Sequence, residues 1–233
     1  MDCFNPISKI NPYKKPCKTL SRGKYNKPML CQVDKLNLNC NGIKHIKRGG
    51  CLPYTIYNGR LYICFGRHNP SRDLTDFGGG KQSNEDIIDC AVRECNEETR
   101  GVFGKITRSI VNRFNCLYNS EMLIILIYIE EADGGNIIEN SKHQFDNNLR
   151  DLIRNNIFSK NKKKEYLEIS ELVWVSEEQI ENISNLPLFN KVRRFLLSSG
   201  LFSSQNSNID FMNGTECQVE SNNNIMVTEI CYA

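Results

Sequence analysis

A short segment, Phe77 to Phe103, places three glutamates close together after a run of glycines. Glu94, Glu97 and Glu98 are three and four residues apart, and on a helix they would lie within an arc of about 100°. Like charges at this spacing repel one another. Either water screens the three carboxylates or a cation binds among them, and the chemistry available to the segment depends on which is true.

Other residues of the segment stand at fixed distances from these glutamates. Over the twenty residues from Gly79 to Glu98, six positions are defined by both type and spacing. They are Gly79, Glu85, Arg93, Glu94, Glu97 and Glu98. An acidic helix face alone is most often a solvated surface. The glycine, the first glutamate and the arginine at these spacings favour a built site over a solvated face.

The segment resembles the Nudix box: Gly, five residues, Glu, seven residues, Arg-Glu, an apolar residue, any residue, Glu-Glu, any residue, Gly and an apolar residue. Three features depart from this pattern. The closing glycine arrives one residue late, at Gly101, and Phe77 stands where a proline usually precedes the glycines. Gly80 and Asn84 loosen the loop before Glu85. None of these changes removes an acidic residue.

The resemblance implies a metal-dependent reaction. It makes Glu97 and Glu98 metal ligands, Glu94 a metal ligand or the base that activates water, and the backbone carbonyl of Gly78 a further ligand. The catalytic residues that it implies are Glu94, Glu97 and Arg93. A diphosphate group is negatively charged, so acidic side chains repel it unless divalent cations reverse the sign of the site. Mg²⁺ prefers oxygen ligands, and Mn²⁺ is the alternative cation. Such ions polarise a phosphoryl oxygen and activate a bound water molecule.

The remaining box residues are expected to support this site. Arg93 would hold the acids in place through a charge-assisted pair with Glu85, and Gly79 and Glu85 would be structural. Arg67 follows a strand and could bind a substrate phosphate, although an exposed loop residue is the simpler interpretation.

The base that activates water is not fixed by the box. Glu94 is one candidate, and three glutamates before Trp174 are alternatives, Glu165, Glu168 and Glu171. All three could also be ordinary solvated residues at the start of a strand. Trp174 itself is expected in the core.

Hydrophobic periodicity predicts the elements that position the box. Asn58-Gly59 between apolar runs predicts a hairpin. Ser83 to about Arg100 is the predicted main helix, with Ser83 as its N-cap and Gly101 as a left-handed residue after its end. Further elements are expected at 106–118 (strand), 121–131 (strand, antiparallel to the previous one), 145–158 (helix), 166–176 (strand) and 188–199 (helix).

The charge distribution divides the chain into three parts. Residues 1–50 hold 11 Lys and Arg against 2 Asp and Glu, a net charge of +9, which leaves −6 for the remainder. We expect a basic N-terminal arm or cap at 1–50, one α/β domain at 51–200 and a disordered tail at 201–233. The arm could bind RNA phosphates and stack bases, or be a solvated arm, through these residues: Lys14, Lys15, Lys18, Arg22, Lys24, Lys27, Tyr13 and Tyr25.

The expected fold is a Nudix-type α/β/α sandwich with a mixed central sheet. The resemblance implies hydrolysis of a diphosphate bond in a nucleoside diphosphate linked to another group, with Mg²⁺. Two alternatives stay open: an mRNA decapping hydrolase that uses the basic arm on capped RNA, and a non-catalytic module that binds nucleotides or RNA.

The sequence also carries expectations about compartment. Eleven cysteines, with no CxxC pair and with Cys64, Cys90, Cys95 and Cys116 inside apolar patterns, favour reduced thiols in an intracellular protein. No apolar run reaches the length of a membrane span. We expect a cytoplasmic protein, in the host cytoplasm if the abundance of Asn, Ile and Lys reflects the AT-rich genome of a large DNA virus.

Overall fold

A computed structural model of the chain describes residues 27–131, 136–154 and 167–200, together with three short strands at 215–217, 225–226 and 229–231. The strands are β1 (Met29–Gln32), β2 (Arg48–Tyr57), β3 (Arg60–His68), β4 (Leu74–Thr75), β5 (Phe77–Gly80), β6 (Asn115–Tyr118), β7 (Met122–Tyr128), β8 (Glu130–Glu131), β9 (Ile169–Ser176), β10 (Thr215–Cys217), β11 (Ile225–Met226) and β12 (Glu229–Cys231). The helices are η1 (Val33–Lys35), α1 (Asn41–Lys44), α2 (Ile87–Glu98), α3 (Arg108–Val111), α4 (Ile137–Arg154), α6 (Glu177–Glu181), η3 (Ile183–Asn185) and α7 (Asn190–Ser199).

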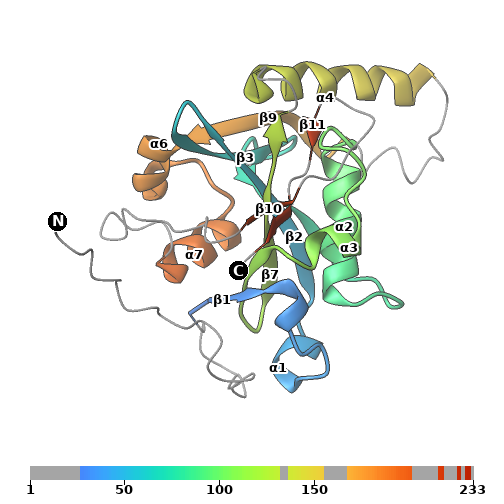
Figure 1. Ribbon diagram of the computed structural model, residues 1–233, viewed down its shortest axis with the longest axis vertical. Helices are drawn as coiled ribbons and strands as arrows, with labels where there is room; N and C mark the ends of the chain where they lie inside the picture. The colour runs from blue at the N-terminus through green and yellow to red at the C-terminus, as the bar shows by residue number, and fades with distance from the viewer. Residues whose placement is uncertain are drawn as a thin grey trace.

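Eight strands form one mixed sheet in the order β1-β6-β7-β2-β3-β4, with β5 paired to β2 and β9 paired to β3. The β2–β7 pair is parallel and the other pairs of this sheet are antiparallel. In Figure 1, α2 and α3 lie to one side of the central strands and α6 and α7 lie to the other. The predicted α/β class, a mixed sheet between helices, is confirmed.

Strand β2 organises the sheet because its two halves have different partners on one edge. Residues 48–51 pair with β5, and residues 54–57 pair with β3, while the opposite edge follows β7 along 48–54. The glycine strand β5 is thereby held beside the start of β2, and α2 packs over both. This arrangement brings the predicted glycines and the predicted acidic helix together.

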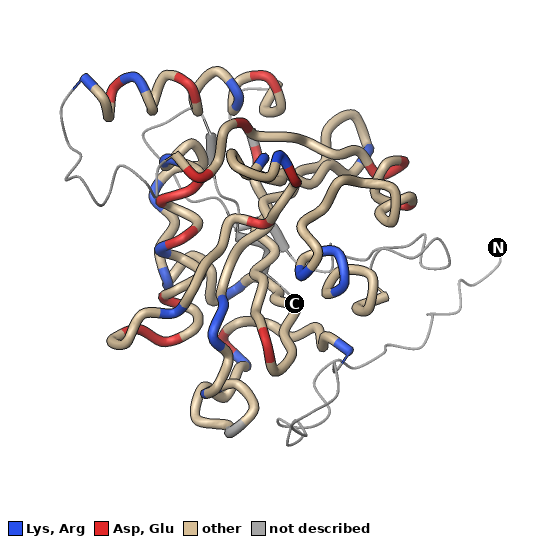
Figure 2. Tube along the Cα trace, turned by 180° about the vertical axis from the view of Figure 1, so that it is seen from behind, with Lys and Arg blue, Asp and Glu red and all other residues tan. Residues whose placement is uncertain are grey.

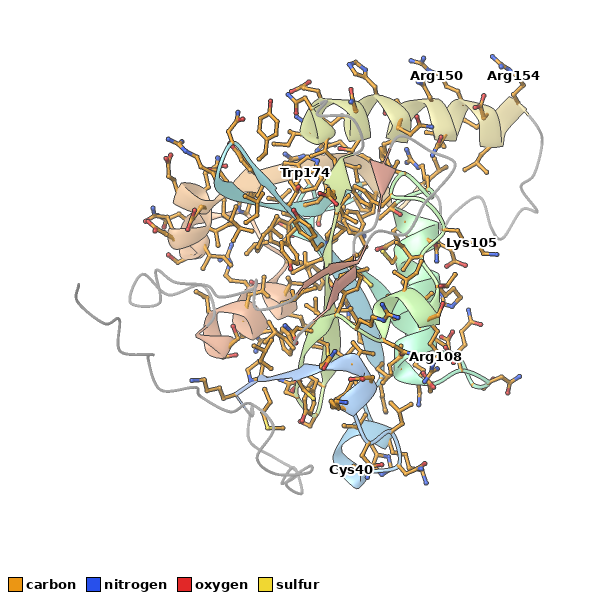
Figure 3. The ribbon with its side chains drawn as sticks, in the orientation of Figure 1. Cys40, Lys105, Arg108, Arg150, Arg154 and Trp174 are labelled. Carbon is orange, nitrogen blue, oxygen red and sulfur yellow. The ribbon has the colours of Figure 1, made fainter. Side chains whose placement is uncertain are left out.

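The predicted hairpin joins β2 to β3. Asn58 and Gly59 have φ of 51° and 73°, the left-handed pair that a tight two-residue turn needs. The strand predicted to contain Trp174 is β9, and Trp174 is in the core, as expected. Its indole Nε1 donates to Ser141 Oγ on α4 at 2.9 Å, and Figure 3 shows the side chain beneath that helix.

The main helix begins at Ile87, so the prediction that Ser83 is its N-cap is wrong. Asp86 is the cap: its Oδ1 accepts hydrogen bonds from the backbone N–H groups of Ile88 and Asp89 at 2.9 and 3.0 Å. A carboxylate at this place also suits the positive end of the helix dipole. Gly101 is left-handed as predicted, with φ of 66°, but Arg100 before it is left-handed too, with φ of 55°.

Three element boundaries differ from the expected ones. Regular structure begins before the predicted domain boundary at Cys51, because β1 pairs with β6 in the main sheet. The strand expected at 106–118 is shortened to β6, since α3 occupies Arg108–Val111. The second helix starts at Ile137 rather than Phe145. The expectations for residues 1–26, 155–166 and most of 201–233 lie outside the described residues, and the division into arm, domain and tail remains a prediction.

The four cysteines predicted as buried thiols are free and buried: Cys64, Cys90, Cys95 and Cys116. Cys40 is an exception to the expected reduced state, because it is disulfide-bonded. Among the described residues, no helix combines the length and the apolar character needed to cross a membrane.

Candidate functional site

Strand β5 and helix α2 place the Glu94 carboxylate directly against a glycine. A Cβ added to Gly79 would lie 2.5 Å from Glu94 Cδ and 2.8 Å from its Oε2, so no other residue fits at position 79 without moving Glu94. A Cβ added to Gly80, one residue on, would meet nothing within 4 Å. The glycine at position 79 therefore leaves the space that the Glu94 carboxylate occupies in this structure.

Arg93 connects the acidic residues to one another. Its Nε and Nη2 donate to the two carboxylate oxygens of Glu85 at 3.0 and 2.8 Å, which is the pair expected from the sequence. Its Nη1 lies 2.8 Å from Glu94 Oε1 and 3.0 Å from Glu97 Oε2. Its Nη2 also donates to the carbonyl of Gly80 at 3.2 Å. Hydrogen bonding to Glu85 is the main cause that raises the pKa of Arg93 above its ordinary value.

Glu98 is the most buried of the three box glutamates on α2. Its side chain accepts a hydrogen bond from the backbone N–H of Gly78, but its Oε2 is buried without a hydrogen-bond partner among the described residues. Burial raises its pKa well above the usual range, and the charges of Asp76 and Glu94 raise it further. The position thus strongly favours either a proton or a cation beside this oxygen.

Glu94 is half-buried, and its pKa is also raised. Burial is the largest cause, Arg93 opposes it, and the charges of Glu97 and Glu168 add to the rise. The three box carboxylates are therefore sheltered between α2 and the sheet, rather than spread over open solvent. In the view from behind, the red segments that mark Asp and Glu recur along the trace of α2 (Figure 2).

Two residues of the site escaped the sequence analysis, Arg48 and Asp76. Asp76 is fully buried. Its two oxygens accept hydrogen bonds from Arg48 Nη1 and Nη2 at 2.6 and 2.8 Å. The pair joins β2 to the residue before β5, across 28 positions of the chain, so no local pattern could have revealed it.

The carbonyl of Gly78, expected as a metal ligand, has a different partner. Arg48 Nη2 donates to it at 2.9 Å. Burial lowers the pKa of Arg48, but Asp76, Glu98 and Glu94 together raise it above its ordinary value. The guanidinium is therefore the positive charge next to this carbonyl.

No group of three or more His, Cys, Asp or Glu side chains within the described residues is arranged to hold a metal ion. In this structure, Glu94 and Glu97 form ion pairs with Arg93. The donor set nevertheless fits Mg²⁺ or Mn²⁺, because carboxylate oxygens are the ligands that hard cations prefer and Glu98 Oε2 is without a partner. Glu94, Glu97 and Glu98 are the residues that could hold such an ion.

The other predicted residues lie on β3 and near β9. Arg67 Nε lies 3.2 Å from Glu171 Oε2, and Arg67 Nη1 donates to the carbonyl of Arg72 at 3.2 Å. Arg67 and Glu171 therefore form an ion pair with each other. Glu168 precedes β9, and its charge is close enough to raise the pKa of Glu94. Of the alternative bases within the described residues, Glu168 is the one whose charge affects the pKa of Glu94.

No family model matches the chain. A protein of Acanthamoeba polyphaga mimivirus, uncharacterized protein L534, is 42% identical over 69 residues. The match covers 27% of this chain and 22% of that protein, so the chain matches only about a fifth of that relative's length.

Three solved structures are similar in fold. An Ap4A hydrolase of C. elegans in a binary complex has a TM-score of 0.38 at 16% identity, over 67% of this chain and 96% of that chain. The Nudix hydrolase RenU of M. smegmatis has a TM-score of 0.35 at 11% identity, over 66% and 83%. A Nudix hydrolase of Listeria monocytogenes described as putative has 0.34 at 13%, over 65% and 90%. All three TM-scores are below 0.5, so the function must be argued from the side chains of the site.

Proposed function

We propose that the chain is a Nudix-type hydrolase that cleaves a diphosphate bond in a nucleoside diphosphate linked to another group, with Mg²⁺ as its cofactor. The observation that carries the proposal is the Glu94 carboxylate packed against Gly79, with Glu98 beside it and its Oε2 buried without a partner. A buried carboxylate oxygen left in this state is costly unless a proton or a cation binds it.

Each residue of the site has a distinct role in the proposed reaction. Glu94, Glu97 and Glu98 bind the cation, which would lower the pKa of a bound water and polarise a phosphoryl oxygen. Arg93 sets the geometry through its two bonds to Glu85, because a guanidinium held along one edge by two hydrogen bonds cannot follow Glu94 or Glu97 freely. Gly79 leaves the room that Glu94 needs.

Two glutamates compete for the role of the base that takes the proton of the attacking water. Glu94 is one, since its raised pKa favours proton uptake. Glu168 is the other, since its charge raises the pKa of Glu94 and since, among the described residues, it lacks an ion pair like the one that joins Glu171 to Arg67. Glu168→Gln separates them: if Glu168 is the base, kcat falls while Mn²⁺ affinity stays unchanged, and if kcat stays at the native value, Glu94 is the base.

Capped RNA as the substrate is supported by a separate observation. Three lysines gather beside the end of β5: Lys44 and Lys47 are exposed, and Lys81 is half-buried. The Lys81 backbone N–H donates to the Lys47 carbonyl at 2.8 Å, and Lys81 Nζ lies 3.5 Å from the Lys44 carbonyl. Lysines so grouped attract phosphates. Release of the cap should then depend on RNA length and on salt, and indifference to both would count against decapping.

The test is cleavage of a substrate panel with Mg²⁺ or Mn²⁺: nucleoside diphosphate derivatives, dinucleoside polyphosphates and capped RNA. The native protein should cleave at least one of them, and the Glu97→Gln, Glu98→Gln variant should be slower by about a hundredfold or more. A matched control exchanges two exposed glutamates elsewhere, Glu139 and Glu181, and should cleave at the native rate. Equal rates in the native protein and the site variant would favour the non-catalytic binding module instead.

A further inference from the structure

The guanidinium of Arg48 is surrounded by oxygen atoms of the candidate site. It donates to both oxygens of Asp76 at 2.6 and 2.8 Å and to the carbonyl of Gly78 at 2.9 Å. The side chain of Arg48 is 18% exposed and that of Asp76 is 0% exposed. Carboxylate and carbonyl oxygens in a buried position are also what a divalent cation would bind.

Two glycines beside this ion pair leave the space that the Asp76 carboxylate occupies. A Cβ added to Gly50 would collide with Asp76 Oδ2 and would lie 2.8 Å from the carbonyl oxygen of Phe77. A Cβ added to Gly78 would likewise lie 2.8 Å from Asp76 Oδ2. Both strands are therefore built to accept the Asp76 carboxylate between them. The Asp76 carboxylate is therefore a buried charge whose counter-charge is the Arg48 guanidinium.

Glu98 connects this ion pair to the acidic face of α2. Its Oε2 is buried without a hydrogen-bond partner among the described residues, and it senses the charges of Asp76, Glu94 and Arg48. The backbone N–H of Gly78, whose carbonyl Arg48 holds, donates to Glu98, so Glu98 is next to the Arg48 ion pair. We call Asp76 and the Gly78 carbonyl the inner group of oxygens, and the carboxylates of Glu94, Glu97 and Glu98 the outer group.

We propose that Arg48 is a resident cation that fills the inner cation position, formed by Asp76 and the Gly78 carbonyl, and so confines divalent ions to the outer position at Glu94, Glu97 and Glu98. The outer position rests on the proposed function; the inner position rests on the contacts of Arg48. Because an arginine is charged at every accessible pH, this positive charge cannot be lost by deprotonation or by chelation. The chain accordingly needs one divalent ion fewer than the same oxygens would bind without Arg48.

Removal of Arg48 should expose the inner oxygens to solvent cations. The exchange Arg48→Gln leaves the buried Asp76 without its counter-charge, which is strongly destabilising unless another cation replaces the guanidinium. Mn²⁺ is a suitable probe, because it takes the same oxygen ligands as Mg²⁺ and is visible by electron paramagnetic resonance. We expect Arg48→Gln to bind one more Mn²⁺ per chain than the native protein.

The experiment compares four proteins in metal-free buffer by calorimetric titration with Mn²⁺ and by the resonance spectrum of the bound ions. Arg48→Gln should gain one ion, and spin coupling between neighbouring ions should broaden its spectrum. Arg48→Gln combined with Asp76→Asn should return to the native number, because the inner position then lacks its carboxylate. Arg108→Gln is the matched control. It removes an arginine, labelled in Figure 3, that pairs with Asp86 and Asp89 at the N-terminal end of α2.

An equal number of ions in the native protein and in Arg48→Gln would overturn the proposal. If Arg48→Gln does not fold without metal, Mn²⁺ must restore its fold at concentrations that leave Arg108→Gln unchanged, since an ion that binds only the folded state stabilises it; failure to restore it would also overturn the proposal. A native protein that binds no Mn²⁺ would contradict the proposed function, whereas the difference between it and Arg48→Gln would still test the role of Arg48.

Discussion

Burial decides the behaviour of Glu98. Its raised pKa means that the folded state prefers the protonated carboxyl more than the unfolded state does. The contribution of Glu98 to stability is therefore complete below the unfolded pKa and is lost as pH rises through the folded pKa. Glu94 adds an effect of the same sign, because its pKa is also raised. Without metal, both acids therefore lower the free energy of unfolding at neutral and higher pH.

Exchange of Glu98 for Gln should stabilise the metal-free protein. At about pH 8 we expect the free energy of unfolding to rise by about 1–3 kcal/mol, since a buried charge is removed. Lowering the pH toward about 5 should narrow the difference, because the native carboxyl then becomes protonated. Urea denaturation of both proteins across this range measures the effect. A metal-free variant less stable than the native protein at about pH 8 would show that Glu98 is stabilised by a partner within the fold.

Arg100 stands where the Nudix box has its glycine, and it keeps the left-handed backbone of a glycine. Its guanidinium lies 3.6 Å from the ring centroid of Phe145, and its Nη2 donates to the Ile169 carbonyl at 2.7 Å. Burial lowers its pKa to about 10. These contacts fasten the end of α2 to α4 and to the start of β9, the strand that Glu168 precedes.

Arg100→Gly should lower the free energy of unfolding by about 2 kcal/mol. It relieves the left-handed backbone, worth about 1 kcal/mol, but it loses the ring contact and leaves buried carbonyls without a donor. Gly101→Ala is the control: its Cβ meets no atom within 4 Å, so its cost is the backbone term alone, about 1 kcal/mol. Denaturation midpoints compare them. An Arg100→Gly protein as stable as the native one would mean that these contacts do not contribute to the fold.

Single-residue predictions succeeded where the partners were close in sequence. Arg93 and Glu85 are eight residues apart on a loop and the helix that follows it, so the spacing alone was enough to indicate their pair. Arg48 and Asp76 meet only because β2 and β5 are neighbours in the sheet. Nothing in the local sequence reports such a pairing, so the partner of the Gly78 carbonyl could not be foreseen.

Among the secondary-structure elements, α2 depends on its first turn. Asp86 caps two backbone N–H groups, and Arg108 Nη1 lies 2.6 Å from Asp86 Oδ2 and 2.7 Å from Asp89 Oδ1. The helix that carries the acidic residues is thereby anchored at its N-terminus to α3.

Asp86→Ala should destabilise the protein by about 1–2 kcal/mol, the usual cost of losing an N-cap. Ser83→Ala should have no measurable effect, because Ser83 is exposed and lies outside the helix. Thermal unfolding of the two variants distinguishes the caps. If Ser83→Ala lost more stability than Asp86→Ala, Ser83 would be the N-cap of the helix, as the sequence predicted.

At the candidate site, the glycines of strand β5 leave space for the Glu94 carboxylate. Gly79→Ala should displace the Glu94 carboxylate and lower Mn²⁺ affinity by about tenfold or more, with the fold retained. Gly80→Ala, where a Cβ meets nothing within 4 Å, should bind Mn²⁺ like the native protein. Titration calorimetry measures both. Equal affinities in the two variants would mean that Glu94 does not bind the metal from its position against Gly79.

Elements were predictable where a strong local signal exists. Asn58-Gly59 defined the hairpin, and apolar spacing defined α2, β7 and α7. The start of α4 was missed because its cap, Asn136, accepts hydrogen bonds from the backbone N–H groups of Ile138 and Glu139 at 3.1 and 3.3 Å, in a segment with weak apolar periodicity. Asparagine is common in this chain, so one capping asparagine does not stand out from the sequence.

For the molecule as a whole, the site exists because β2 has three partners. The first half of β2 pairs with the glycine strand, the second half pairs with β3, and β7 runs parallel along the other edge. This topology brings together residues from before β5, from α2 and from before β9. The predicted α/β class was within reach of the sequence, whereas the split edge of β2, which places Arg48 in the site, was not.

The measurement that tests the central claim most directly is an anomalous difference map from crystals grown with Mn²⁺. The claim is that a divalent ion binds between the side chains of Glu94, Glu97 and Glu98. We expect an anomalous peak within ligand distance of these carboxylates, with the Glu94 and Glu97 oxygens turned from Arg93 toward the ion. A map with Mn²⁺ bound elsewhere, and with both carboxylates still paired to Arg93, would contradict the claim.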